Sequence, residues 1–207
     1  YKNQKKFLEL NEQKKTAELT ALRNQLNPHF LFNTLNNLYS LTLDKSDKAP
    51  EVIERLSDIL DYILYRCTDN YVPIQKEIEL IENYLTLEKI RYGKRVSIKF
   101  EHLADKDVKI APLLLLTFVE NAFKHGVCQE LGQAKIEISL TLKNADIIFS
   151  TFNSKPNNVA EIQQENEEHL GIKNIKKQLK LLYPNSYDLQ ISEKGNSFSV
   201  ILKLKAK

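Results

Sequence analysis

The chain has 207 residues, a length that suits one large domain or two small ones. Its 42% hydrophobic and 28% charged residues are ordinary for a soluble globular protein and argue against overall disorder. With 30 basic and 27 acidic side chains the net charge is +3, so composition gives no reason to expect nucleic acid as a partner. The two cysteines, Cys67 and Cys128, lie far apart without a C-x-x-C, which favours reduced thiols over a disulfide framework or a zinc site.

The first 25 residues predict a solvated helix, because Lys, Glu, Gln and Leu dominate and neither Gly nor Pro occurs. Leu19, Leu22 and Leu26 form a short apolar seam that leaves two interpretations open, a charged lead-in helix and a signalling coiled coil. The chain begins at Tyr1 and contains no methionine, so we expect a fragment of a longer protein. Its longest apolar run, 110–119, is too short to span a bilayer, and any membrane segment is expected upstream.

Residues 29–43 and 50–67 predict two helices, joined by a turn in "DKSDKAP". The preceding Asn27-Pro28 is either a helix cap followed by proline in the first turn or a kink in one long helix. The second helix has the strongest periodicity in the chain, with apolar residues at Val52, Ile53, Leu56, Ile59, Leu60, Ile63 and Leu64. Because two helices bury little by themselves, we expect this hairpin domain, residues 1–70, to form a four-helix bundle with a second copy.

The second predicted domain, residues 71–207, follows a linker at 68–73 and opens with an amphipathic helix at 74–92. Short β-rich segments then appear at 95–101, 134–142, 145–152, 187–193 and 197–205. Further helices are predicted between them, at 112–127 and 171–183. This order predicts an α+β fold in which helices cover one face of a mostly antiparallel sheet. The polar segment 153–169 has no strong period, which is typical of a functional or disordered loop.

A histidine stands in the apolar stretch "LNPHFLFNTLNNL", residues 26–38. At ~100° per residue, His29, Asn33, Asn36 and Ser40 fall within roughly 60° of one another on a helix. Leu31, Leu35, Leu38 and Thr42 cluster on the opposite side, which we expect to be buried. The spacing therefore predicts an outward imidazole, which suits a nucleophile at neutral pH and equally suits a histidine that caps or packs at a proline kink.

A second polar stripe lies in "LLLLTFVENAFKHG", residues 113–126. Its members, which share one face at helical spacing, are Thr117, Glu120, Asn121, Lys124 and His125. An amide oxygen such as that of Asn121 suits Mg²⁺, which keeps most of its waters and bridges to phosphates, and Lys124 supplies positive charge for a polyphosphate. By spacing alone, a solvated helix face with a chance Glu–Lys pair is the more frequent explanation of such a stripe.

Taken together, these motifs resemble the LytS/YehU-type sensor histidine kinases. The stretch "LNPHFLFNTLNNL" resembles the phosphoacceptor signature of that family, and "VPIQKEIELIENYLTLEKIRYG" resembles its linker helix. The stretch "FVENAFKHG" resembles its N box, and "LGIKNIKKQLKLLYP" resembles its second glycine box. The match runs in the family's order over nearly the whole chain, and the first and third motifs are highly specific.

The resemblance implies a cytoplasmic kinase core with a Bergerat-type ATP-binding α/β sandwich over residues ~75–207 and a mobile ATP lid at about 153–170. It implies that His29 is the autophosphorylated residue, that Asn121 coordinates Mg²⁺, and that Lys124 and His125 lie near the phosphates. Because many other histidine kinases carry an acid directly after the histidine, where this chain has Phe30, Glu120 is the candidate proton acceptor.

Asn33, one turn from His29, matches a position that orients water for phosphatase activity in other kinases. The resemblance further implies a homodimer and transfer of the phosphoryl group to an aspartate of a response regulator with a LytTR DNA-binding domain. The full-length protein is then expected in the bacterial inner membrane, held only by a segment upstream of this chain.

The sequence departs from the wider ATPase superfamily at both glycine boxes. Asn153 stands where an aspartate usually binds the adenine amino group, and the two glycines that should follow are absent from "FSTFNSKPN". In "HLGIKN" only Gly171 and Asn174 remain of the second box, and Gln178 replaces a common arginine. An asparagine accepts through its carbonyl without charge assistance, so we expect weaker adenine binding and a stiffer lid.

These departures leave three functions to compare. The first is an ATP-dependent protein histidine kinase, and the second is a non-catalytic dimeric signalling scaffold of the same fold. The third is an ATPase without a phosphohistidine, which the histidine-bearing "NPHFLFN" stretch argues against, because such ATPases have no need of it.

Overall fold

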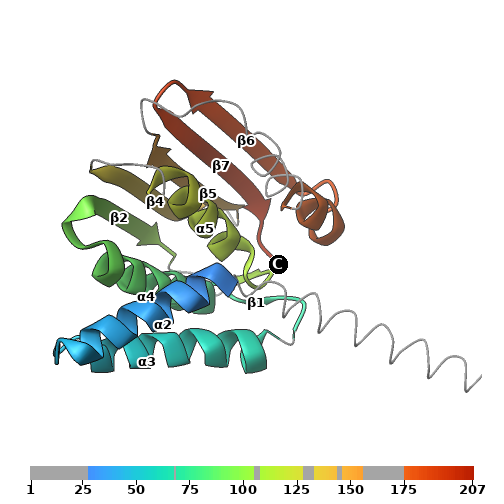
Figure 1. Cartoon of the computed structure of the whole chain (residues 1–207). Helices are drawn as coiled ribbons and strands as arrows, with labels where there is room; N and C mark the ends of the chain where they lie inside the picture. The colour runs from blue at the N-terminus through green and yellow to red at the C-terminus, as the bar shows by residue number, and fades with distance from the viewer. Residues whose placement is uncertain (1–27, 68, 105–107, 128–132, 144–145, 156–174) are drawn as a thin grey trace, which may run out of the picture. The chain divides into compact units, whose positions relative to one another are not determined.

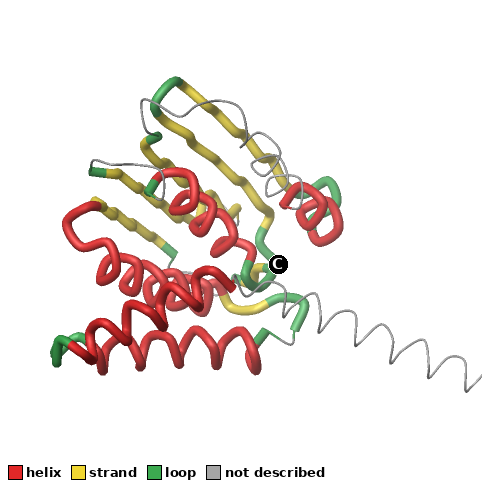
Figure 2. The backbone as a smooth tube through the Cα atoms, in the orientation of Figure 1, coloured by secondary structure: helices red, strands yellow, loops and turns green. Residues whose placement is uncertain are grey.

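The computed structural model describes residues 28–67, 69–104, 108–127, 133–143, 146–155 and 175–207. The predicted helix at 1–25 therefore lies outside the described residues. The chain forms two compact units whose boundary falls between Arg66 and Cys67. Figure 1 labels their helices and strands, and Figure 2 separates helix from strand by colour.

The first unit is a helical hairpin. Helix α2 (Pro28–Leu43) packs against α3 (Ala49–Asp61), and α3 continues as one π-helical turn, η1 (Tyr62–Arg66). Pro50 lies in the first turn of α3, where its fixed φ is already helical and its missing N–H has no helical acceptor. The side chains that α3 and η1 bury are Ala49, Val52, Leu56, Ile59, Tyr62 and Ile63, which confirms the helical period. Of the other predicted apolar positions, Leu60 is half-buried, and Ile53 and Leu64 are exposed in the single chain.

The buried face of α2 differs from the predicted one. Phe30 and Thr34 are its buried residues, whereas Leu35 is 44% exposed and Thr42 is also exposed. The expectation that Leu31, Leu35, Leu38 and Thr42 form one buried stripe is therefore wrong for the single chain. The physical reason is that a hairpin offers α2 one neighbouring helix, so only part of its apolar surface is covered.

The second unit begins with strand β1 (Val72–Pro73), which pairs antiparallel with β3 (Lys109–Ile110). Between them lie helix α4 (Ile74–Tyr92), the 3₁₀ turn η2 (Gly93–Arg95) and strand β2 (Val96–Leu103). Helix α5 (Leu114–Gly126) follows β3. The remaining strands are β4 (Ala134–Lys143), β5 (Asp146–Ser154), β6 (Tyr187–Lys194) and β7 (Ser197–Lys205), and a helix spans residues 175–182.

Among the described residues, one five-stranded sheet has the order β2-β4-β5-β7-β6. The β2–β4 pair is parallel and the other three pairs are antiparallel, which confirms the predicted mixed, mostly antiparallel sheet. Alternate side chains of the central strands are buried, because one face of the sheet is covered and the other is solvated. In β4 the buried residues are Ala134, Ile136, Ile138 and Leu140. Helices α4 and α5 pack on each other and on the β2, β4 and β5 side of the sheet (Figure 1).

Candidate functional site

His29 lies in the first turn of α2 with its side chain exposed, as the helical spacing predicts. The Asn33 amide nitrogen, one turn later, lies 3.2 Å from His29 Nδ1 and 3.1 Å from Nε2. A neutral imidazole has one acceptor nitrogen, so the amide donates to whichever ring nitrogen carries no proton. The amide thereby selects a ring orientation and leaves the imidazole on the surface of the helix.

Helix α5 is anchored by an apolar face that is buried in the sheet, and this face contains Leu115, Phe118, Val119 and Ala122. On the other face Thr117, Glu120 and Asn121 are half-buried and Lys124 is exposed. The structure therefore brings the predicted carboxylate, carboxamide and ammonium onto one side of one helix. Of His125 only the backbone within α5 is described.

Two carboxylates meet where α4 and α5 pack together. Burial raises the pKa of Glu120 to about 8, and the nearby Glu88 carboxylate on α4 contributes to the shift. Burial likewise raises the pKa of Glu88 to about 7, opposed by Arg91 and by a hydrogen bond with Tyr84. Two nearby carboxylates in a low-dielectric site resist simultaneous ionisation, so the pair favours one retained proton near neutral pH.

Arg91 and three aromatic rings close this site. Arg91 Nη1 lies 3.2 Å from Glu88 Oε1, and its guanidinium stacks 4.3 Å from the centroid of the Tyr92 ring. Tyr92 in turn stacks on Phe123 of α5, while Tyr84 meets the same ring edge-on. Sequence reasoning missed Glu88 and Arg91, although a glutamate among the apolar positions of the 74–92 helix was a visible signal.

Asn153 is buried at the end of β5, not in the loop where the sequence analysis had placed it. Its Nδ2 donates to the Ser154 carbonyl oxygen at 3.1 Å. Gly126, the last residue of α5, lies so close that a Cβ there would be 2.8 Å from the Asn153 Cβ. The glycine of the "KHG" motif therefore allows the end of α5 to approach the end of β5.

Comparison with known proteins agrees with this architecture. Residues 17–96 match the family model described as histidine kinase. The sensor histidine kinase YpdA of Escherichia coli (strain K12) is 30% identical over 197 residues, covering 92% of this chain and 35% of that protein. The sensor histidine kinase/phosphatase LytS of Staphylococcus aureus (strain Mu50) is 30% identical over 202 residues, covering 91% of this chain and 34% of that protein.

This chain belongs to the histidine kinase family. It spans about a third of the length of these two relatives. A solved structure described as a bacterial phosphotransferase shares the fold with a TM-score of 0.50 at 9% identity, covering 88% of this chain and 96% of that one.

Several residues predicted for nucleotide binding lie outside the described residues. These are Gly171 and Asn174, together with the predicted lid from residue 156 onward. None of the helices in the described ranges combines the length and the apolar character that a membrane span requires.

Among the residues that the structure describes there is also no group of three His, Cys, Asp or Glu side chains arranged to hold a metal ion. An amide donor such as Asn121, with water and phosphate oxygens completing the shell, fits the coordination habits of Mg²⁺.

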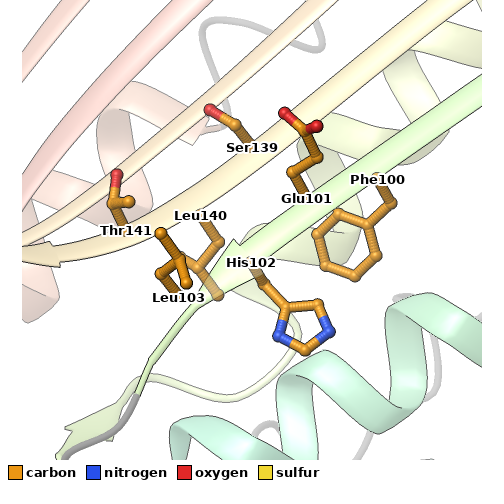
Figure 3. A pocket seen from close by; sticks show the side chains of 7 residues that line it. All are labelled: Phe100, Glu101, His102, Leu103, Ser139, Leu140 and Thr141. Atoms are coloured by element: carbon orange, nitrogen blue, oxygen red, sulfur yellow. The ribbon is translucent and has the colours of Figure 1, made fainter.

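A pocket of about 590 Å³ opens along the C-terminal halves of β2 and β4 (Figure 3). Its walls are Phe100, Glu101, His102, Leu103, Ser139, Leu140 and Thr141. Glu101, Ser139 and Thr141 point to one side of the two strands, while Phe100 and His102 point to the other. None of the predicted nucleotide-binding residues lines this pocket, and its polar groups do not converge on one point.

Proposed function

We propose that this chain is the kinase core of a two-component sensor, which transfers the γ-phosphoryl group of Mg·ATP to His29 and then to an aspartate of a response regulator. The single observation that carries the proposal is an exposed His29, oriented by Asn33, in a chain whose α5 presents Glu120, Asn121 and Lys124 on one face. Phosphoryl transfer needs positioning and charge neutralisation more than covalent help from the protein, and these side chains supply both.

In this proposal each nucleotide-site residue has one role. Asn121 offers its amide oxygen to Mg²⁺, and Lys124 and His125 neutralise phosphate oxygens. Asn153 accepts the adenine amino group through its carbonyl oxygen, because its Nδ2 already donates to Ser154. Gly171 and Asn174 complete the phosphate side, as the resemblance of their motif implies. When bound, Mg²⁺ neutralises charge on the transferring phosphoryl group.

Glu120 is the proposed proton acceptor for the His29 ring. Burial raises the pKa of Glu120 to about 8, so only the ionised minority of Glu120 carboxylates can accept a proton at neutral pH, and we expect phosphorylation of His29 to become faster as pH rises toward 8. Once the Asn33 amide has released it, the ring nitrogen that carries no proton attacks the γ-phosphorus in line, and the bond from that phosphorus to the oxygen of the leaving ADP breaks. The other ring nitrogen gives its proton to the ionised Glu120 carboxylate as the phosphohistidine forms.

The exposed apolar stripe on α2 supports the proposed homodimer. Its members are Phe32, Leu35, Tyr39 and Leu43, which are 67%, 44%, 64% and 65% exposed in the single chain. Such a stripe on one helix is typical of a surface that a second copy covers in a four-helix bundle. We further propose a cytoplasmic position, an inner-membrane segment upstream, and a LytTR-type response regulator as the phosphoryl acceptor.

Incubation with γ-labelled ATP and Mg²⁺ tests the kinase proposal. We expect acid-labile label on the wild-type chain, complete loss of label in His29→Gln, and normal labelling in the control His102→Gln, which changes another exposed histidine. Release of phosphate without protein label would favour a simple ATPase, and neither label nor release would favour a non-catalytic scaffold.

A second activity, phosphatase action on the regulator, is favoured by the position of Asn33. Its amide reaches the His29 ring and can equally orient a water molecule at the same surface. The Staphylococcus aureus relative is named as both kinase and phosphatase. We expect Asn33→Ala to dephosphorylate a phosphorylated receiver about tenfold more slowly, while Asn36→Ala, an exposed neighbour, retains the wild-type rate. Normal dephosphorylation by Asn33→Ala would exclude this role.

A further inference from the structure

The turn that leads into α5, residues 111–113, is held by two buried side chains from distant parts of the second unit. The Leu113 N–H donates to Glu77 Oε1 on α4 at 2.8 Å. The Ala111 N–H donates to the Tyr183 hydroxyl oxygen, also at 2.8 Å. Pro112 has no N–H, so both backbone donors of the turn end on side chains, not on regular secondary structure.

The backbone of this turn is strained at Leu113. Its φ of 62° and ψ of 1° place a leucine in the left-handed region, which is sterically unfavourable for a residue with a Cβ. Such a conformation persists only where the surroundings over-determine it. The bond from Leu113 to Glu77 supplies one constraint, and the burial of Leu113, Leu114 and Leu115 supplies another.

Glu77 does more than fill space. It is 0% exposed, and a buried carboxylate is costly where an apolar side chain of similar size would pack equally well. Its position at the first backbone N–H before α5 places negative charge at the positive end of that helix dipole. No side chain at the N-cap position of α5 makes that bond, so α4 supplies the cap from outside.

Tyr183 connects the same turn to the helix at 175–182, which it directly follows. Its ring meets Tyr71 edge-on at 6.0 Å between centroids, and the Tyr71 hydroxyl donates to the Leu182 carbonyl oxygen at 2.9 Å. Burial is the main cause that raises the pKa of Tyr183 to about 12, and the nearby Glu77 carboxylate contributes to the shift. The two side chains that hold the turn therefore lie close together.

We propose that Glu77 and Tyr183 are positioning residues, which set the start of α5 and thereby the placement of Asn121 and Lys124 along its polar face. The inference rests on the proposed nucleotide site. A helix is stiff over this distance, because Asn121 lies about 12 Å along the axis from Leu113. A displacement of residues 111–113 therefore moves the Asn121 amide and the Lys124 ammonium by a similar distance.

The test compares Glu77→Leu, Glu77→Gln and Tyr183→Phe in the whole chain. The controls are Glu79→Leu, which makes the same change on the exposed side of α4, and Tyr187→Phe, at a half-buried tyrosine on β6. Circular dichroism checks folding, and hydrogen exchange measures opening of the Ala111 and Leu113 amides without nucleotide. Calorimetry measures two dissociation constants. One Kd is that of the Mg²⁺ complex of a non-hydrolysable ATP analogue, and the other is that of adenosine.

We expect Glu77→Leu and Tyr183→Phe to speed exchange of their partner amide and to raise the Kd of the magnesium analogue about tenfold, with adenosine changed by less than about twofold. Glu77→Gln keeps an acceptor oxygen, so its Kd should stay within about threefold of wild type. The split between the two ligands separates positioning of the phosphate side from a general loss of stability.

Wild-type affinity for the magnesium analogue in folded Tyr183→Phe and Glu77→Leu would overturn the proposal, as would equal weakening of adenosine. Should Glu77→Leu fail to fold, Tyr183→Phe, which removes one hydroxyl and keeps the ring, decides the matter. A wild-type chain that binds no nucleotide would overturn the proposed function together with this role. Unchanged hydrogen exchange of the Ala111 and Leu113 amides in these variants would overturn the positioning role of Glu77 and Tyr183 and leave the proposed function standing.

Discussion

Gly126 shows how one missing side chain shapes the candidate nucleotide site. The space where its Cβ would lie is filled by Asn153, whose Cβ and Nδ2 would be 2.8 and 3.1 Å away, and by the Ser154 carbonyl oxygen at 3.2 Å. These neighbours belong to a buried strand end and cannot swing aside as an exposed side chain can. Glycine is therefore required at position 126 because the end of α5 lies so close to the end of β5, and not because of the dihedral angles of Gly126.

Gly126→Ala should displace Asn153 and cost about 1–3 kcal/mol of unfolding free energy, because overpacking outweighs the better helix propensity of alanine. We also expect weaker binding of adenine nucleotides, measured by calorimetry. Gly195→Asn is the control, since nothing lies within 4 Å of a Cβ at Gly195 and asparagine tolerates its positive φ. Unchanged stability and affinity in Gly126→Ala would contradict the close approach.

At the scale of elements, α2 carries three different faces. One face, with Phe30 and Thr34, is buried within the single chain, and the Thr34 hydroxyl donates to the Phe30 carbonyl oxygen at 2.9 Å. The polar face presents His29, and the exposed apolar stripe lies beside it. A helix with this division suits a dimer in which the second copy covers the apolar stripe and leaves the histidine accessible.

Leu35→Glu combined with Tyr39→Glu should convert a dimer to a monomer, because two charges would enter the proposed interface. We expect the dimer Kd to rise by at least about a hundredfold, measured by light scattering across a concentration series. Asn36→Glu, on the exposed polar face of the same helix, should leave the dimer intact. A wild-type chain that is already monomeric would rule out this use of the stripe.

At the scale of the whole molecule, α4 links the parts of the second unit. It packs on α5 and on β2, it caps α5 through Glu77, and it brings Glu88 beside Glu120. The titratable groups that act on Glu88 are Arg91 and Tyr84 on its own helix, and Glu120 lies nearby on α5. A buried carboxyl that keeps its proton after folding makes global stability depend on pH.

The sign of that dependence follows from the direction of the shift. Folding raises the pKa of Glu88 from 4.5 to about 7, so between these values the folded chain retains a proton that the unfolded chain has lost. Stability therefore falls as pH rises through this window, by on the order of 3 kcal/mol. Glu120, whose pKa is raised to about 8, changes stability in the same direction.

Glu88→Gln removes the titrating group and should flatten this dependence. We expect the melting temperature of Glu88→Gln minus that of wild type to increase between pH 5 and pH 8, by about 5 °C. The exposed Glu101→Gln should show no such trend. Parallel melting curves for wild type and Glu88→Gln across this range would show that Glu88 is ionised throughout.

The period of the apolar residues was sufficient to predict the longer helices and strands. The five main strands begin and end within two residues of their predicted positions, and the helices at 50–67 and 74–92 match α3 with η1 and α4. These segments can be predicted locally, because apolar residues repeat every two positions in a strand and every 3.6 in a helix, whichever element each one packs against. The two-residue strands β1 and β3 were missed because a bridge of that length leaves no periodic signal.

The site was predictable only where its residues share one helix. His29 with Asn33, and Glu120 with Asn121 and Lys124, are neighbours through helical geometry alone, so their common faces followed from spacing. Glu88 beside Glu120, Glu77 beneath Leu113 and Gly126 against Asn153 join elements far apart in the chain. No local pattern encodes which two elements will touch.

The amino-acid sequence by itself determined the order of helices and strands, the outward position of His29 and the family to which the chain belongs, because these depend on local periodicity and on contiguous motifs. Only the tertiary structure decided which face of α2 is buried, that Asn153 ends a strand, and that α4 holds α5 through buried carboxylates. Those features depend on which surfaces remain to be covered once the sheet and its helices have packed, and packing is a property of the whole chain.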